Sequence, residues 1–127
     1  MTAYGPYPAV VLDWHDGDTC HPNIDLGFGV ILAAYDTKGR PVRELRLLGI
    51  DTPELATSLG PAARAAAQAL CPAGTQVTIT SGSWDKYGGR IDGTITLPDG
   101  TDFGQRMIAA GLAQPYTGQG PKPPWPA

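Results

Sequence analysis

Glycine and proline are spread so densely along this chain that no regular segment can run far without a turn. The 127 residues include 17 glycines and 13 prolines, with turn clusters at 36–41, 72–74 and 98–100. That proportion is close to the range of disordered chains, but 42% of the residues are hydrophobic and only 17% are charged. Short apolar runs between turn clusters are typical of strands. The sequence therefore predicts a small β-rich domain.

The apolar runs predict five strands and two short helices. The expected strands are residues 7–14, 24–35, 42–50, 76–80 and 90–97. The expected helices are 62–70, opened by Gly60-Pro61, and 102–110, with Asp102 as N-cap and Gly111 as the stop. In the third strand, alternation places Val42, Glu44, Arg46 and Leu48 on one face and Arg43, Leu45, Leu47 and Gly49 on the other.

The expected order has five short strands, with one helix after the third strand and another after the fifth. This order predicts an α+β fold. The order fits a five-stranded, partly open β-barrel of the oligonucleotide-binding (OB) type. We expect one domain over residues 1–116. Residues 117–127 are rich in proline and lack periodicity, so we expect an extended or disordered tail there.

Charge and apolar patterning narrow the class of protein. The net charge is −3 and the pI about 5.1, which argues against a broad basic surface for nucleic acid. No apolar run of 18 residues is present, and the N-terminus lacks the pattern of a secretory leader. We therefore expect a cytoplasmic or phage-encoded intracellular monomer without a membrane partner; a processed secreted form is the less favoured alternative. Cys20 and Cys71 are interpreted as reduced thiols, with a disulfide as the alternative.

Acidic residues gather in two segments that follow predicted strands. One is Asp16-Gly17-Asp18-Thr19 and the other is Asp51-Thr52-Pro53-Glu54. Carboxylates combined with backbone carbonyls are the ligands that hard cations such as Ca²⁺ and Mg²⁺ require. Asp-Gly and Asp-Thr-Pro are also common turn sequences, so either segment alone is more simply interpreted as a turn.

Taken in order, four motifs resemble the staphylococcal nuclease (thermonuclease) family. They are Asp16-Gly17-Asp18-Thr19, the run Arg46 to Glu54 (RLLGIDTPE), Asp85-Lys86-Tyr87-Gly88-Gly89-Arg90, and Gly111-Leu112-Ala113 with Tyr116. The resemblance covers about residues 7–116. Members of that family have a five-stranded OB barrel and cleave DNA and RNA with Ca²⁺ and water, leaving 3′-phosphates.

The resemblance implies a role for each matching residue. Asp18 and Asp51 correspond to the metal carboxylates, and Thr52 to the residue whose backbone carbonyl binds the metal. Glu54 corresponds to the residue that orients or deprotonates the attacking water. The matches to the phosphate clamps are Arg46 and Arg90, and the matches to the substrate-binding residues are Lys86, Tyr87 and Tyr116.

The chain departs from the family pattern in four places, one of which is a shorter loop from Glu54 to Gly60. Gly89 is an extra residue before Arg90, and a one-residue shift in a strand turns a side chain to the other face. The segment between Asp18 and Tyr35 is longer, and we expect residues 23–29 to form an extended or bulged hairpin beside the metal. The third family helix is replaced by the proline-rich tail.

These observations predict a calcium-dependent phosphodiesterase, an endonuclease with little sequence preference. The low sequence preference is expected because a tyrosine face stacks on any base. The expected substrates are DNA and RNA, preferably single-stranded or unpaired. The alternative is a catalytically silent OB-fold domain of the same family that binds nucleic acid or a protein. The presence of every expected carboxylate and arginine favours the enzyme.

Overall fold

The computed structural model describes residues 4–84, 90–117, 120–122 and 124–125. Its elements are, in order, β1 (Tyr4–Trp14), β2 (Thr19–Gly27), β3 (Val30–Leu32), β4 (Glu44–Leu47), β5 (Ile50–Asp51), α1 (Gly60–Leu70), β6 (Gln76–Trp84), β7 (Arg90–Thr96), α2 (Phe103–Ala109) and β8 (Gln114–Pro115).

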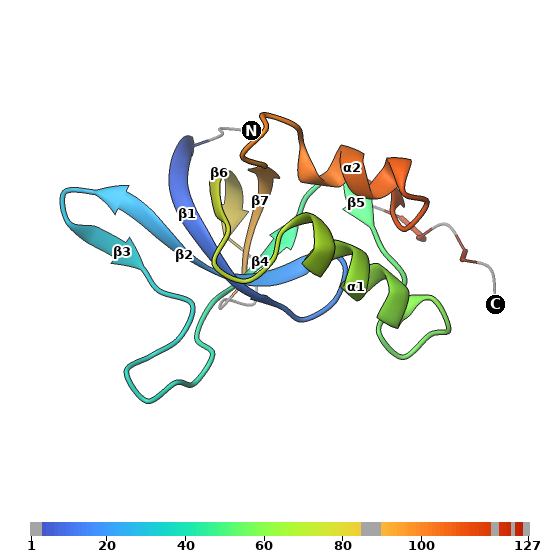
Figure 1. The fold of residues 1–127 in the computed structure, drawn as a ribbon, viewed down its shortest axis with the longest axis horizontal. Coiled ribbons are helices and arrows are strands. Elements are labelled where there is room, and N and C mark those ends of the chain that lie inside the picture. The colour runs from blue at the N-terminus through green and yellow to red at the C-terminus, as the bar shows by residue number, and fades with distance from the viewer. Residues whose placement is uncertain (1–3, 85–89, 118–119, 123, 126–127) are drawn as a thin grey trace.

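Five of the strands close into a barrel, with both helices on one side of it (Figure 1). The main sheet has the order β1-β6-β7-β4-β2-β3, and a further pairing of β1 with β2 completes the closure. β4 and β7 run parallel, whereas the other pairings of this sheet are antiparallel. The predicted α+β class with an OB-type barrel is confirmed.

The alternation predicted for the third strand is confirmed in β4, and it explains how the barrel is filled. Leu45 and Leu47 are buried, while Glu44 and Arg46 lie half-buried on the opposite face. At the end of β1, Trp14 stacks on Phe103 of α2 with ring centroids 4.7 Å apart. The Trp14 indole also donates a hydrogen bond to the carbonyl of Cys71 at 2.9 Å. The end of β1 is thereby fixed to α2 and to the end of α1.

Both helices begin as the sequence predicts. α1 starts at Gly60 with proline in its first turn, and it buries Ala63 and Ala67 against the barrel. α2 is capped by Asp102, whose carboxylate accepts a hydrogen bond from the Gln105 amide at 2.9 Å. Such short helices depend on packing against the rest of the domain.

Several strand boundaries differ from expectation because glycines turn the chain. The expected strand 24–35 is split: β2 pairs with β3 as a hairpin whose turn contains Phe28 and Gly29, both with positive φ. The third strand stops at Leu47, and Gly49 (φ 84°) turns the chain into the two-residue β5. β1 and β6 also extend further than predicted, and β8, which pairs with β5, was not predicted.

The β2–β3 hairpin forms as expected, but its predicted location is wrong. The hairpin points away from β5 and α1 (Figure 1). Asp25 accepts a hydrogen bond from the Gly27 amide at 2.8 Å within the hairpin itself. The extra residues therefore lengthen the side of the barrel away from the second acidic segment.

Two further features concern the whole described chain. No described helix is both long enough and apolar enough to cross a membrane. Cys20 and Cys71 are free, buried thiols, and burial raises the pKa of both.

Candidate active site

The first acidic segment forms the tight connection between β1 and β2. The Asp18 amide donates to the Asp16 carboxylate at 3.1 Å, and the His15 amide donates to the Thr19 carbonyl at 2.9 Å. Gly17 lies so close to the second segment that a Cβ there would stand 2.9 Å from Thr52 Oγ1. A side chain at this position would clash with Thr52, so glycine permits the two acidic segments to lie in contact.

The second acidic segment, which includes β5, meets the first directly. The Thr52 amide donates to Asp18 Oδ2 at 3.2 Å, which joins residues 34 positions apart. Asp18, Asp51 and Thr52 are 5%, 3% and 4% exposed. Burial of ionisable groups is costly unless they are paired or bind a cation, so the concentration of buried carboxylates here indicates a functional site.

Arg46 joins the same cluster from β4. Thr19 and Arg46 are paired residues of β2 and β4, and Arg46 Nη1 lies 2.7 Å from Asp18 Oδ2. Burial nevertheless raises the pKa of Asp18 to about 6, an effect that the Arg46 guanidinium opposes. The arginine therefore does not fully offset the loss of hydration at this carboxylate.

A cavity of about 320 Å³ opens at these residues. Its lining includes Asp18, Asp51, Thr52, Arg46, Arg90 and Glu54. Glu54 is exposed, and its backbone carbonyl accepts a hydrogen bond from the Thr57 amide at 2.9 Å. The structure thus brings together all six residues that the sequence predicts for metal binding and catalysis, despite the extra glycine before Arg90.

A neighbouring cavity of about 330 Å³ shares Arg46 and Arg90 and adds Tyr116. Tyr116 follows β8, and its amide donates to the Gly49 carbonyl at 3.0 Å. Its hydroxyl donates to the Gly120 carbonyl at 2.8 Å. The other two predicted substrate-binding residues, Lys86 and Tyr87, lie outside the described residues.

Two residues of the site were missed by the sequence analysis. Lys122 Nζ lies 3.3 Å from Asp51 Oδ1, and the Trp125 indole donates to Asp51 Oδ2 at 3.0 Å. Lys122 lines both cavities. Both residues belong to the proline-rich tail, where no periodicity marks side chains that face the barrel.

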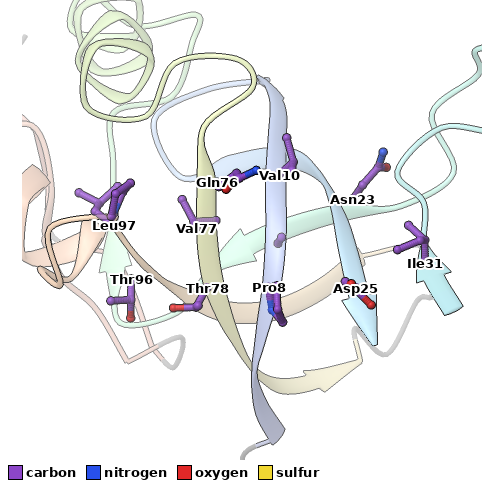
Figure 2. Close-up of a pocket in the computed structure, with 12 residues that line it drawn as sticks. Pro8, Val10, Asn23, Asp25, Ile31, Gln76, Val77, Thr78, Thr96 and Leu97 are labelled. Atoms are coloured by element: carbon purple, nitrogen blue, oxygen red, sulfur yellow. The ribbon is translucent and has the colours of Figure 1, made fainter. Parts of the chain in front are cut away.

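A larger cavity, of about 690 Å³, lies elsewhere, on the outside of β1, β2 and β6 (Figure 2). Pro8, Val10 and Ile31 contribute apolar surface there, and Asn23, Gln76 and Thr78 contribute neutral polar groups. Asp25 is the one charged group among its described lining residues. Volume alone would favour this cavity as the functional site. The carboxylates and arginines that line the two smaller cavities favour those instead.

The donors of the 320 Å³ cavity fit a hard cation. Within the residues that the structure describes, no three His, Cys, Asp or Glu side chains cluster closely enough to hold a metal by themselves. Asp18, Asp51 and a Thr52 carbonyl would supply oxygen donors only, the type that Ca²⁺ prefers. Thr52 Oγ1 is also buried without a hydrogen-bond partner in the described part of the chain. The set leaves coordination positions for water and for a substrate oxygen.

A small barrel with two buried carboxylates and two arginines at one cleft defines a class of protein, an OB-type domain suited to a cation and an anionic ligand. The family model of staphylococcal nuclease homologues matches residues 44–124, and the chain belongs to this family. It is also similar to an uncharacterized endonuclease of Escherichia coli, at 38% identity over 77 residues, or 61% of this chain. The chain spans about half of that relative, 49% of its length.

Proposed function

We propose that this chain is a Ca²⁺-dependent nuclease that hydrolyses phosphodiester bonds of DNA and RNA with little sequence preference. The observation that carries the proposal is the meeting of Asp18, Asp51 and Arg46 in one buried cleft. These side chains come from three separate segments of the chain, and the Arg46 guanidinium and the Thr52 amide do not fully offset the burial of the Asp18 carboxylate. A chance cluster of turn carboxylates would lie at the surface, where water solvates the charges.

The roles follow from what each side chain can do at its position. Asp18, Asp51 and the Thr52 carbonyl would hold the cation. When bound, Ca²⁺ supplies Lewis-acid stabilisation of the negative charge on the phosphate. Arg46 and Arg90 would bind the non-bridging phosphate oxygens, because a guanidinium presents two parallel N–H donors and stays charged. Their common position on both cavities supports this role.

Glu54 is the proposed base of the reaction. Its carboxylate would accept a proton from water as the water oxygen bonds to phosphorus. The bond from phosphorus to the 5′-oxygen breaks, and that oxygen takes a proton from solvent, which leaves a 3′-phosphate and a 5′-hydroxyl. Tyr116, beside Arg46 and Arg90, would contact the nucleotide. Stacking of bases on tyrosine requires unpaired bases and tolerates any sequence, which supports single-stranded substrates.

The test compares cleavage of labelled single-stranded DNA and RNA with Ca²⁺ and with a chelator. Wild type should cleave only with Ca²⁺, and its products should carry phosphatase-sensitive 3′ ends. Glu54→Gln should reduce kcat by about 100-fold or more, whereas Glu44→Gln, a matched change on β4, should retain activity. An inactive wild type that still binds oligonucleotide would support the silent binding domain instead. Full activity of Glu54→Gln would exclude Glu54 as the base.

A further inference from the structure

The C-terminal segment, defined as the described residues 120–122 and 124–125, donates to both oxygens of one candidate metal ligand. Lys122 Nζ lies 3.3 Å from Asp51 Oδ1, and Trp125 Nε1 lies 3.0 Å from Asp51 Oδ2. Asp51 is 3% exposed, so these two donors contact a carboxylate that has little access to water. The segment is also held at Tyr116, whose hydroxyl donates to the Gly120 carbonyl at 2.8 Å.

The two donors differ in what they would do when a cation arrives. A Ca²⁺ ligand oxygen lies 2.3–2.6 Å from the ion, so a cation bound to Asp51 Oδ1 would stand next to the Lys122 ammonium. Two cations at one carboxylate oxygen repel each other strongly at a buried site. The indole of Trp125 is neutral and contacts the other oxygen. It can keep its hydrogen bond while the metal is bound, as donors to metal ligands commonly do.

We propose that the C-terminal segment is part of the metal site, a proposal that rests on the function proposed above. Trp125 is a positioning residue that orients the Asp51 carboxylate toward the cation, and Lys122 is a place-holder that occupies the cation's position until metal displaces it. Lys122 lines the adjoining cavity as well as the carboxylate cavity, so the displaced ammonium has a second, solvent-filled space to enter. The two residues therefore act on metal affinity in opposite directions.

The first measurement is made without metal on the full chain. The indole N–H resonance of Trp125 should shift between wild type and Asp51→Asn, because the charged acceptor is replaced by a neutral one. An unchanged resonance would show that Trp125 does not contact Asp51 in solution, which would overturn the proposal.

The second measurement is Ca²⁺ affinity by calorimetric titration, which does not depend on cleavage. Lys122→Met should bind Ca²⁺ about tenfold more tightly, because the competing cation is removed. Lys122→Arg keeps a cation at the same place and should stay within about threefold of wild type. The matched control is Lys38→Met, the same change of charge in the loop after β3, and it should leave the affinity within about twofold.

Trp125→Phe keeps the ring but removes the donor, and it should weaken Ca²⁺ binding about tenfold. Thermal midpoints of the metal-free variants check that each chain is folded. Equal affinities of wild type and both variants would overturn the proposal while leaving the nuclease function intact. The expected pattern of affinities without any cleavage would support the metal site and contradict the nuclease. If neither wild type nor Lys122→Met binds Ca²⁺, Lys122 does not occupy the position of a cation and the proposal is wrong.

Discussion

The Asp18 carboxyl makes the metal-free protein sensitive to pH. Its pKa is raised from its ordinary value of 3.8 to about 6, chiefly by burial. The folded chain therefore binds this proton more tightly than the unfolded chain does. The tighter binding of this proton adds to the free energy of unfolding, and the added stability is fully present below pH 3.8. It is lost as the pH rises from 3.8 to about 6, and the total loss is at most about 3 kcal/mol.

We therefore predict that Asp18→Asn stabilises the metal-free protein by about 1–3 kcal/mol at pH 7.5 and by much less at pH 4. The measurement is chemical denaturation at both pH values in the presence of a chelator. Asp25→Asn, in the distant hairpin, is the control and should change the free energy of unfolding by less than about 0.5 kcal/mol. Equal effects of Asp18→Asn at the two pH values would show that folding does not raise the pKa of this carboxyl.

Arg46 differs from a lysine in the geometry of its donors. Arg46→Lys keeps the charge but loses the planar pair of N–H groups, so kcat on a single-stranded oligonucleotide should fall about 100-fold at saturating Ca²⁺. Arg43→Lys is the matched change in the segment just before β4, where the side chain donates to the Ala33 carbonyl, and it should retain activity. A near-normal rate for Arg46→Lys would exclude Arg46 as a phosphate clamp.

At the scale of the elements, the start of α1 packs directly against the segment that carries Glu54. A Cβ at Gly60 would lie 2.1 Å from the Glu54 carbonyl oxygen and 2.5 Å from the Leu55 Cα. Both contacts are with backbone, which cannot move aside as a side chain would. The position of the loop that carries Glu54 thus depends on a glycine at the first residue of the helix.

Gly60→Ala should therefore displace Glu54 and reduce kcat at least about tenfold, with a loss of stability of about 1–3 kcal/mol. Ala65→Gly, at an exposed position of α1, should cost about 1 kcal/mol through helix propensity alone and leave kcat unchanged. The comparison of kcat with unfolding free energy separates the two effects. Loss of activity in both variants would indicate general destabilisation.

The sequence predicted the elements better than it predicted their placement. The alternation around Leu45 and the capping by Asp102 are local signals, and both identify elements correctly. The strand β5 has two residues and pairs with β8, which also has two. Such short pairings carry no periodicity, and they form because tertiary packing brings the segments together.

In the candidate site, too, local motifs predicted some residues, whereas others are brought in only by tertiary packing. The motifs located Asp18, Asp51 and Arg46, whose meeting depends on the barrel register that the family fold provides. Lys122 and Trp125 reach Asp51 from a proline-rich segment, in which no pattern distinguishes contacting residues from solvent-exposed ones. The direction of the β2–β3 hairpin likewise depends on how glycine turns orient it.

In the whole molecule, the stacked pair of Trp14 and Phe103 joins the barrel to α2. Phe103 is fully buried, so Phe103→Ala should lower the free energy of unfolding by about 3–5 kcal/mol through lost burial and a residual cavity. Phe28→Ala removes the same atoms at a fully exposed hairpin position and should change it by less than about 0.5 kcal/mol. Urea denaturation followed by circular dichroism distinguishes these outcomes, and similar effects of the two changes would contradict the assignment of the core.

The two buried thiols offer a way to time the opening of this molecule. Cys20 lies in β2 and Cys71 directly follows α1, so they belong to the barrel and to the helical side. Thiol reagents react with the thiolate form of an accessible cysteine, and both groups are shielded from solvent and kept protonated by burial. Their labelling rates therefore report how often each part of the fold opens, and faster labelling of Cys71 than of Cys20 is the result expected if α1 detaches while the barrel remains closed.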